Sequence, residues 1–288
     1  MQRRRIVEEP VSKLAIWARR FALFALVATL LSVIVVRSGL LEIVPALATF
    51  AGALMCAVIA ILLAVGALVV IWREGVEGIG YTFTAVALAL ALLAYPAYLG
   101  FKASRLPAIA DITTDAVDPP RFEAIARLRT REANPVLYAG LYAAELQRNA
   151  YPDVESLDIS TTPQAAYDAA RAVITKRRWK VILDRRPQPG RRDGQIEAVA
   201  RTPIMGFSDD VVVRVRAVPD GARIDVRSAS RYGRHDLGAN AARIKSLLED
   251  IEEQVEPPEE KPEKPVKAEK KDKKGQAKGG TAQRRDRR

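Results

Sequence analysis

Cysteine and histidine are almost absent from this sequence of 288 residues. Cys56 is the only cysteine and His235 is the only histidine. A single cysteine excludes an intrachain disulfide, and one residue of each kind excludes a zinc site built from cysteine and histidine ligands. The sequence also lacks a Walker A pattern and a G-x-G-x-x-G pattern, so no motif predicts a nucleotide cofactor, and we expect none.

Charge is missing from three long runs near the N-terminus. They extend from Phe21 to Val36, from Ile43 to Trp72 and from Ile79 to Phe101. Three such runs in succession exceed what a soluble core needs. The sequence therefore predicts an α-helical membrane anchor in the lipid bilayer, within residues 1–102, with transmembrane helices at about residues 18–36, 46–70 and 79–101. The spans lack charged pairs, which disfavours a transporter.

Basic residues are distributed unevenly around this anchor. Those before the first span are Arg3, Arg4, Arg5, Lys13, Arg19 and Arg20. The first loop offers only Arg37 and the second only Arg73, whereas Lys102 and Arg105 follow the third span. The positive-inside rule then predicts a cytoplasmic N-terminus. Three crossings put the rest of the chain outside, so we expect a multi-pass protein of the bacterial inner membrane with a periplasmic C-terminal domain.

Apolar residues are scarce again at the C-terminus. Residues 256–288 contain one valine, no aromatic residue, 12 basic residues and 7 acidic residues. Such a segment cannot bury enough apolar surface to offset its ordering entropy, so we expect a disordered basic tail. The tail is either attracted weakly to anionic lipid or polymer, or solvated without a partner. Residues 103–255 hold 24 basic and 22 acidic residues, so the chain's basic character predicts no specific nucleic-acid partner.

Residues 103–255 have the patterns of an α+β domain. Short helical stretches are expected after Pro120 and over 135–149. Thr162 and Pro163 predict the start of a helix that ends near Trp179. Alternating strand patterns follow at 179–186, 194–202, 209–218 and 222–230, and a last helix, capped by Asp236, runs on to Val255. We therefore expect an antiparallel four-stranded sheet with helices on one face.

The turn at Pro219–Gly221 predicts a hairpin between the last two strands. Pairing their apolar faces places Arg214 opposite Asp225. A glycine bulge at the turn would instead shift the register by one residue and break that pair.

Several segments together resemble one protein family. They are DITTD and DPPRF within 111–122, YPDV at 151–154, IEAVARTPIMGFSDDVVVRV at 196–215 and IDVRSASRYGRHDLGANAARI at 224–244. Over about residues 106–251 the chain resembles the domain of unknown function 1499 family (DUF1499), whose members often follow bacterial membrane spans, as here. The resemblance implies no mechanism. His235 stands where the family commonly has a small polar residue, which argues against a catalytic histidine.

One candidate site lies in RSASRYGRHDLGANAARI, residues 227–244, where a loop with a glycine leads from a strand into a helix. Such a loop presents amides to an anion, and its arginines suit phosphate or carboxylate. The predicted ligand-binding residues are Arg227, Ser228, Ser230, Arg231, Gly233, Asp236, Asn240 and Arg243. The alternative is a capped turn, in which Asp236 caps the helix and the arginines pair with Asp209, Asp210 and Asp225.

A second candidate site is acidic. Its residues are Asp111, Thr114, Asp115, Asp118, Asp209 and Asp210. Carboxylates can bind a hard cation or act as general acid and base. The alternative is that they bond backbone amides and pair with Arg214 and Arg227. A triad of His235, Asp236 and a nearby serine is disfavoured, because side chains of adjacent residues diverge.

Two functional hypotheses follow. The first is a non-catalytic, membrane-anchored envelope protein whose domain binds a protein or an anionic ligand. The second is a periplasmic carboxylate-dependent hydrolase, with or without a divalent metal ion. A cleft where Asp111 or Asp115 meets Asp209 or Asp210, with raised pKa values, would favour the enzyme. Aspartates neutralised by arginines would favour the binding module.

Overall fold

The computed structural model describes residues 10–39, 41–188, 190 and 193–255. The predicted disordered tail at 256–288 lies outside these residues, as do Arg3, Arg4 and Arg5, which contribute to the predicted orientation.

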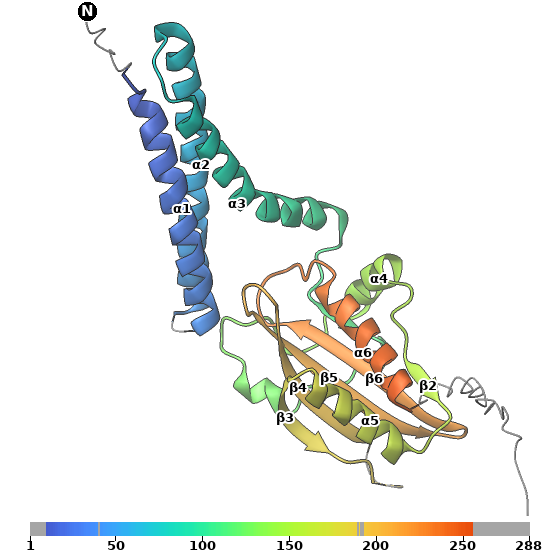
Figure 1. The fold of residues 1–288 in the computed structure, drawn as a ribbon. Helices are drawn as coiled ribbons and strands as arrows, with labels where there is room; N and C mark the ends of the chain where they lie inside the picture. Colours follow the sequence, from blue (N-terminus) through green and yellow to red (C-terminus); the bar gives the residue numbers. More distant parts are fainter. Residues whose placement is uncertain (1–9, 40, 189, 191–192, 256–288) are drawn as a thin grey trace, which may run out of the picture. The chain divides into compact units, whose positions relative to one another are not determined.

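Three helices form the N-terminal region: α1 (Lys13–Ser38), α2 (Ile43–Glu74) and α3 (Ile79–Arg105) (Figure 1). All three are long and apolar enough to cross a membrane, as predicted. Small side chains meet where the helices pack, among them Ala22, Ala60 and Ala89. Alanine allows helix backbones to approach closely, while larger apolar residues such as Phe24 and Leu62 remain exposed, as a lipid-facing surface requires.

Helix α3 continues beyond its apolar run. Pro96 lies inside it, and Figure 1 shows the helix changing direction in its C-terminal part. Proline removes one backbone hydrogen bond and crowds the preceding turn, which accounts for the bend. The last turn carries Lys102 and Arg105.

The domain contains an antiparallel sheet in the order β1-β6-β5-β4-β3. The four predicted strands are present as β3 (Lys180–Arg185), β4 (Gly194–Arg201), β5 (Ser208–Val218) and β6 (Gly221–Ser230). The expected total of four was wrong, because β1 (Asp111–Thr113) and β2 (Leu157–Ile159) both pair with the second edge of β6, making six strands. Strands of three residues are too short to alternate recognisably; they pair because β6 offers them a free edge.

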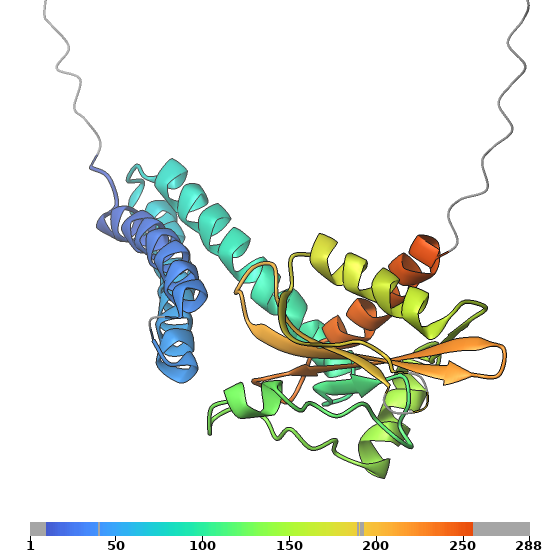
Figure 2. The same ribbon diagram turned by 90° about the horizontal axis from the view of Figure 1, so that it is seen from below.

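Helices α5 (Pro163–Lys176) and α6 (Ala239–Val255) pack on one face of the sheet (Figure 2). The side chain of Thr162 caps α5, as predicted. The predicted register of the hairpin is confirmed, with Arg214 opposite Asp225. Helix α6 begins three residues after Asp236, because Leu237 and Gly238 both have positive φ.

The other face of the sheet is covered by an irregular segment, residues 114–139, which contains the short helix η1 (Ile125–Leu128) (Figure 2). Phe122 and Ile125 pack there against Val212 of β5 and Ala229 of β6. The helix predicted over 135–149 begins later, as α4 (Leu141–Ala150), because Gly140 at its N-terminus has a φ of 79°.

The outer edge of β1 is covered by a side chain of α4. Gln147 accepts a hydrogen bond from the backbone N–H of Thr113 at 3.0 Å and donates one to its carbonyl at 2.6 Å. An open strand edge would expose both groups to pairing with another chain. The contact fixes α4, and the loop before it, against the sheet.

Gly221 provides a test of the pairing between β2 and β6. Its φ is 147°, and a Cβ atom there would lie 2.1 Å from the carbonyl oxygen of Ile159. We expect Gly221→Ala to lower the free energy of unfolding by roughly 3 kcal/mol, since it adds a clash to backbone strain. Urea unfolding of the detergent-solubilised protein measures this loss.

Gly233 is the control, because it also has positive φ, of 86°, but only one atom within 4 Å of the added Cβ, at 3.9 Å. Gly233→Ala should lower the stability by only about 1–2 kcal/mol, the penalty of left-handed backbone alone. Equal losses in the two variants would contradict the close approach of β2 to Gly221.

Candidate functional site

The turn between β6 and α6 is closed by Asp236. This buried carboxylate accepts hydrogen bonds from the backbone N–H groups of Gly238 and Asn240, each at 2.9 Å. It therefore occupies the N-terminal end of α6, where an anion would otherwise bind. Gly233, with its positive φ, shapes the turn that leads there.

Behind this turn, a buried polar network joins β6 to α6. Ser228 donates to the side-chain oxygen of Asn240 at 2.8 Å, and the Asn240 amide donates to the Ser230 hydroxyl at 3.0 Å. Arg243 donates to Ser228 at 2.9 Å and forms an ion pair with Asp209 of β5. The predicted ligand-binding residues at the end of β6 and at the start of α6 are thus hydrogen-bonded to one another.

Arg227 belongs to the opposite face of the sheet. Its guanidinium forms an ion pair with Asp111 at 2.7 Å and donates to the carbonyl oxygen of Val136 at 2.8 Å. It also lies 4.8 Å from the ring centroid of Phe122 and 5.6 Å from that of Tyr138. The side chain is buried, so Arg227 holds the covering segment on the sheet.

The acidic residues lie apart. Successive residues of a strand point to opposite faces, so Asp209 faces α6 whereas Asp210 faces the covering segment. Asp111 and Asp210 both stand beside Ala229 in the strand register, which separates their backbones by about 10 Å. Asp210 is paired with Arg129 at 2.7 Å and with Arg231 at 2.8 Å.

The remaining acidic candidates lie nearer the β5–β6 hairpin. Asp115 and Asp118 form ion pairs with Arg214 at 3.3 and 2.9 Å. The Thr114 hydroxyl accepts a hydrogen bond from the backbone N–H of Val226. Among residues 10–255, apart from the few positions that are not described, no three Asp, Glu, His or Cys side chains lie close enough to hold a metal ion.

Burial changes the pKa of several of these carboxyl groups. It raises the pKa of Asp111 and Asp209 above the usual value, against the pull of Arg227 and Arg243 respectively. Burial also acts to raise the pKa of Asp115, but the amides of Asp118 and Val117, with Arg216, outweigh it and lower the pKa. Because each of these three groups has an arginine partner, none is an open acid or base.

Two more buried carboxylates lie outside both predicted sites. Glu197 accepts hydrogen bonds from the backbone N–H groups of Glu123 at 2.6 Å and Ile125 at 2.8 Å, and so caps η1. Asp225 accepts a bond from Ser156 at 2.7 Å and pairs with Arg214 at 3.0 Å. The predicted pairing with Arg214 already marked Asp225, whereas the role of Glu197 was missed; its signal was an acidic residue within an apolar strand pattern.

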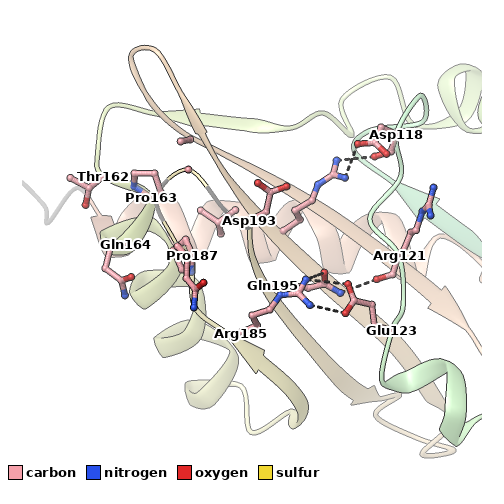
Figure 3. A pocket seen from close by; sticks show the side chains of 15 residues that line it. Asp118, Arg121, Glu123, Thr162, Pro163, Gln164, Arg185, Pro187, Asp193 and Gln195 are labelled. Carbon is pink, nitrogen blue, oxygen red and sulfur yellow. Dashed lines mark hydrogen bonds and ion pairs between the residues drawn. The ribbon is translucent and has the colours of Figure 1, made fainter.

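A hollow of about 1100 Å³ opens near the N-terminus of α5 (Figure 3). It is lined by the segment before η1, the first residues of α5, the β3–β4 connection and β5. Its charged lining residues are Asp118, Arg121, Glu123, Arg185, Asp193 and Arg214. Asp118 is the only one of the predicted site residues in its lining. We call this hollow the α5 cavity.

Most charges of the α5 cavity are matched within its wall. Arg185 pairs with Glu123 at 2.7 Å and donates to Gln195, while Arg214 pairs with Asp118 (Figure 3). The Arg121 guanidinium has no hydrogen-bond or ion-pair partner within the described part of the chain. At the start of α5, Pro163 has no N–H and the amides of Ala165 and Ala166 donate to Thr162, so the amide of Gln164 is the one left to a ligand among these described residues. The cavity therefore offers an anion the guanidinium of Arg121 and one amide of α5, with the carboxylate of Asp193 also in its wall.

Comparison with known protein families gives a match for this domain. Residues 111–251 match the model of a family described as protein of unknown function (DUF1499). The match begins at β1 and ends within α6, and it confirms the resemblance expected over about residues 106–251. Searches of curated proteins and of solved structures return no significant match.

The ion pair of Arg227 with Asp111 is open to a direct test. We expect Arg227→Ala to lower the free energy of unfolding by roughly 3–5 kcal/mol, because it leaves a buried carboxylate without its partner. The exposed pair between Arg223 and Asp158 is the control. Arg223→Ala should leave the stability nearly unchanged in the same urea unfolding, because solvent screens an exposed ion pair.

A double variant separates the loss of charge balance from the loss of packing. Asp111→Asn combined with Arg227→Met leaves no unpaired charge, so we expect it to be more stable than Arg227→Ala. If Arg227→Ala were no more destabilising than Arg223→Ala, the ion pair would not hold the covering segment.

Proposed function

Residues 111–251 form a DUF1499 domain behind three membrane-length helices, and we propose that the protein is a membrane-anchored binding protein without catalytic activity. Its domain binds an anionic ligand, or an anionic group of a partner protein, in the α5 cavity. The anchor lies in the inner membrane of a bacterium, with the N-terminus in the cytoplasm and the domain in the periplasm.

The pairing of acidic side chains with arginines carries the non-catalytic part of this proposal. A carboxylate hydrolase needs at least one carboxyl group with access to substrate, and commonly two that act together. Here Asp209 and Asp210 lie on opposite faces of the sheet, and each is bonded to arginine. Their charges are used in holding the fold together.

The α5 cavity is favoured over the arginine-rich turn as the ligand site. Arg231 and Arg243 would have to leave Asp210 and Asp209 before they could bind a ligand. Arg121 makes no such contact among the described residues, and it lines the cavity together with the first residues of α5. The turn then serves to fix α6, and the cavity receives the anion.

The orientation of the anchor can be tested with fusions after Val255. We expect alkaline phosphatase to be active at this position and a cytoplasm-dependent fluorescent protein to be dark, since basic residues concentrate before the first span. The same fusions after Glu74, at the end of α2, should give the reverse pattern. A fluorescent, phosphatase-negative fusion after Val255 would place the domain in the cytoplasm and contradict the proposed localisation.

Ligand binding can be tested with a photo-crosslinking residue in the full-length protein in cells. At Gln164, which lines the α5 cavity, it should capture a specific partner or ligand. At Ala172, an exposed position of the same helix outside the cavity, it should not. Arg121→Glu should reduce capture at Gln164 roughly tenfold, because it removes a charge-assisted hydrogen bond.

Arg127→Glu is the matched control for the charge reversal, since Arg127 is an exposed arginine of η1 outside the cavity. Capture that survives Arg121→Glu, or that occurs equally at Ala172, would contradict the proposed ligand site.

A further inference from the structure

An uncharged and exposed segment comprises the loop before α4 and the first turn of that helix. Residues 133–144 contain no acidic or basic side chain. Within them Leu137 is 85% exposed, Leu141 87% and Tyr142 75%. Three large apolar side chains close together in the chain and this exposed are a typical mark of a binding surface rather than of ordinary solvent contact. We refer to residues 135–142 as the apolar loop.

The domain holds the apolar loop in place. Asn134, just before it, donates hydrogen bonds to the carbonyl oxygens of Ser230 at 2.9 Å and Gly233 at 2.8 Å. The carbonyl of Val136 accepts from buried Arg227, and the Tyr138 ring lies against the same guanidinium. Leu137 is exposed between these two anchored residues. The exposed side chains thus belong to a preformed surface.

Chain connectivity keeps this loop near the membrane. Leu137 and Tyr142 line a hollow of about 310 Å³ together with Ala108, Ile109 and Ala110. The apolar run of α3 ends at Phe101 and the helix at Arg105. Four helical steps and three extended ones span at most about 17 Å from Phe101 to Ala108. The headgroup layer occupies roughly 5–8 Å of that distance, so the hollow lies close to the lipid surface.

The charges around the loop fit an anionic lipid surface. Lys102 and Arg105 lie in the last turn of α3, and the exposed Arg234 lines the same hollow as Leu137. The acidic groups nearby are Asp111, which is paired with Arg227, and the exposed Glu132 and Glu145, which flank the uncharged segment in the sequence. Leucine, tyrosine and arginine together are typical of segments that lie in the membrane interface.

We propose that the apolar loop is a second membrane contact of this protein. Leu137, Leu141 and Tyr142 enter the boundary between headgroups and acyl chains, and Arg234 lies at the level of the lipid phosphates. The contact fixes the orientation of the domain on the bilayer. It rests on the membrane anchor alone and is independent of ligand binding in the α5 cavity.

The test uses the full-length protein with Cys56→Ala, which removes the only native thiol. Single cysteines at Leu137, at Tyr142 and, as a control, at Val117 carry an environment-sensitive fluorophore. Val117 is 98% exposed and lies between Asp115 and Asp118, which pair with Arg214 nearer the hairpin. The protein is reconstituted in liposomes of phosphatidylethanolamine and phosphatidylglycerol, with and without lipid brominated near the headgroup.

Brominated lipid should quench most of the fluorescence at positions 137 and 142 and little of it at position 117. Arg234→Glu should reduce the quenching at 137 and 142 by reversing the charge that faces the phosphates. Equal quenching at all three positions would overturn the proposal. So would a blue shift at 137 and 142 without quenching, because that result indicates burial against a protein or a second copy of this chain.

Discussion

Buried carboxylates on one face of the sheet impose the main constraint on this domain. Glu197, Asp210 and Asp225 are fully buried on the face that lacks α5 and α6. An uncompensated charge in such a place is destabilising by several kcal/mol, so each needs cations or hydrogen-bond donors close by. Arg214 of β5 and Ser156 meet this requirement for Asp225, and Arg231, just after β6, meets part of it for Asp210. The covering segment, residues 114–139, supplies amides to Glu197 and Arg129 to Asp210.

The irregular shape of that segment follows from the same constraint. A regular helix uses its backbone amides and carbonyls internally, whereas this segment leaves them free for side chains of the sheet. Glu197 takes amides at the start of η1, and Arg227 takes the carbonyls of Pro120 and Val136. The segment is therefore ordered by charged groups beneath it more than by its own periodicity. This explains how so many polar residues contribute to stability without forming an open site.

The elements that were predictable from the sequence are those with local signals. Thr162 and Pro163 mark the start of α5, the apolar faces of the last two strands indicate the hairpin register, and three uncharged runs mark the membrane helices. Strands β1 and β2 carry no such signal, because their pairing depends on the free edge of β6. The start of α6 was misplaced because the positive φ of Leu237 cannot be seen in a helical pattern.

The sequence indicated which types of residue matter in this domain more readily than it indicated where the fold puts them. The predicted arginines Arg227, Arg231 and Arg243 do lie near aspartates, but strand alternation divides them between two faces, and each of the three pairs with an aspartate. The α5 cavity could not be predicted, because Arg121, Gln164 and Gln195 come from segments that only the tertiary fold brings together.

The two proposed surfaces lie toward opposite ends of the sheet. Val215, in the wall of the α5 cavity, pairs with Ile224, whereas Ser230 lines the hollow of the apolar loop. Six residues along β6 separate these positions, or about 20 Å. If the apolar loop rests on the lipid surface, the α5 cavity lies at the far end of β6 from that contact, so lipid bound at the loop does not occupy the cavity. A domain fixed in this way receives a ligand in a defined orientation, which a flexibly tethered domain cannot do.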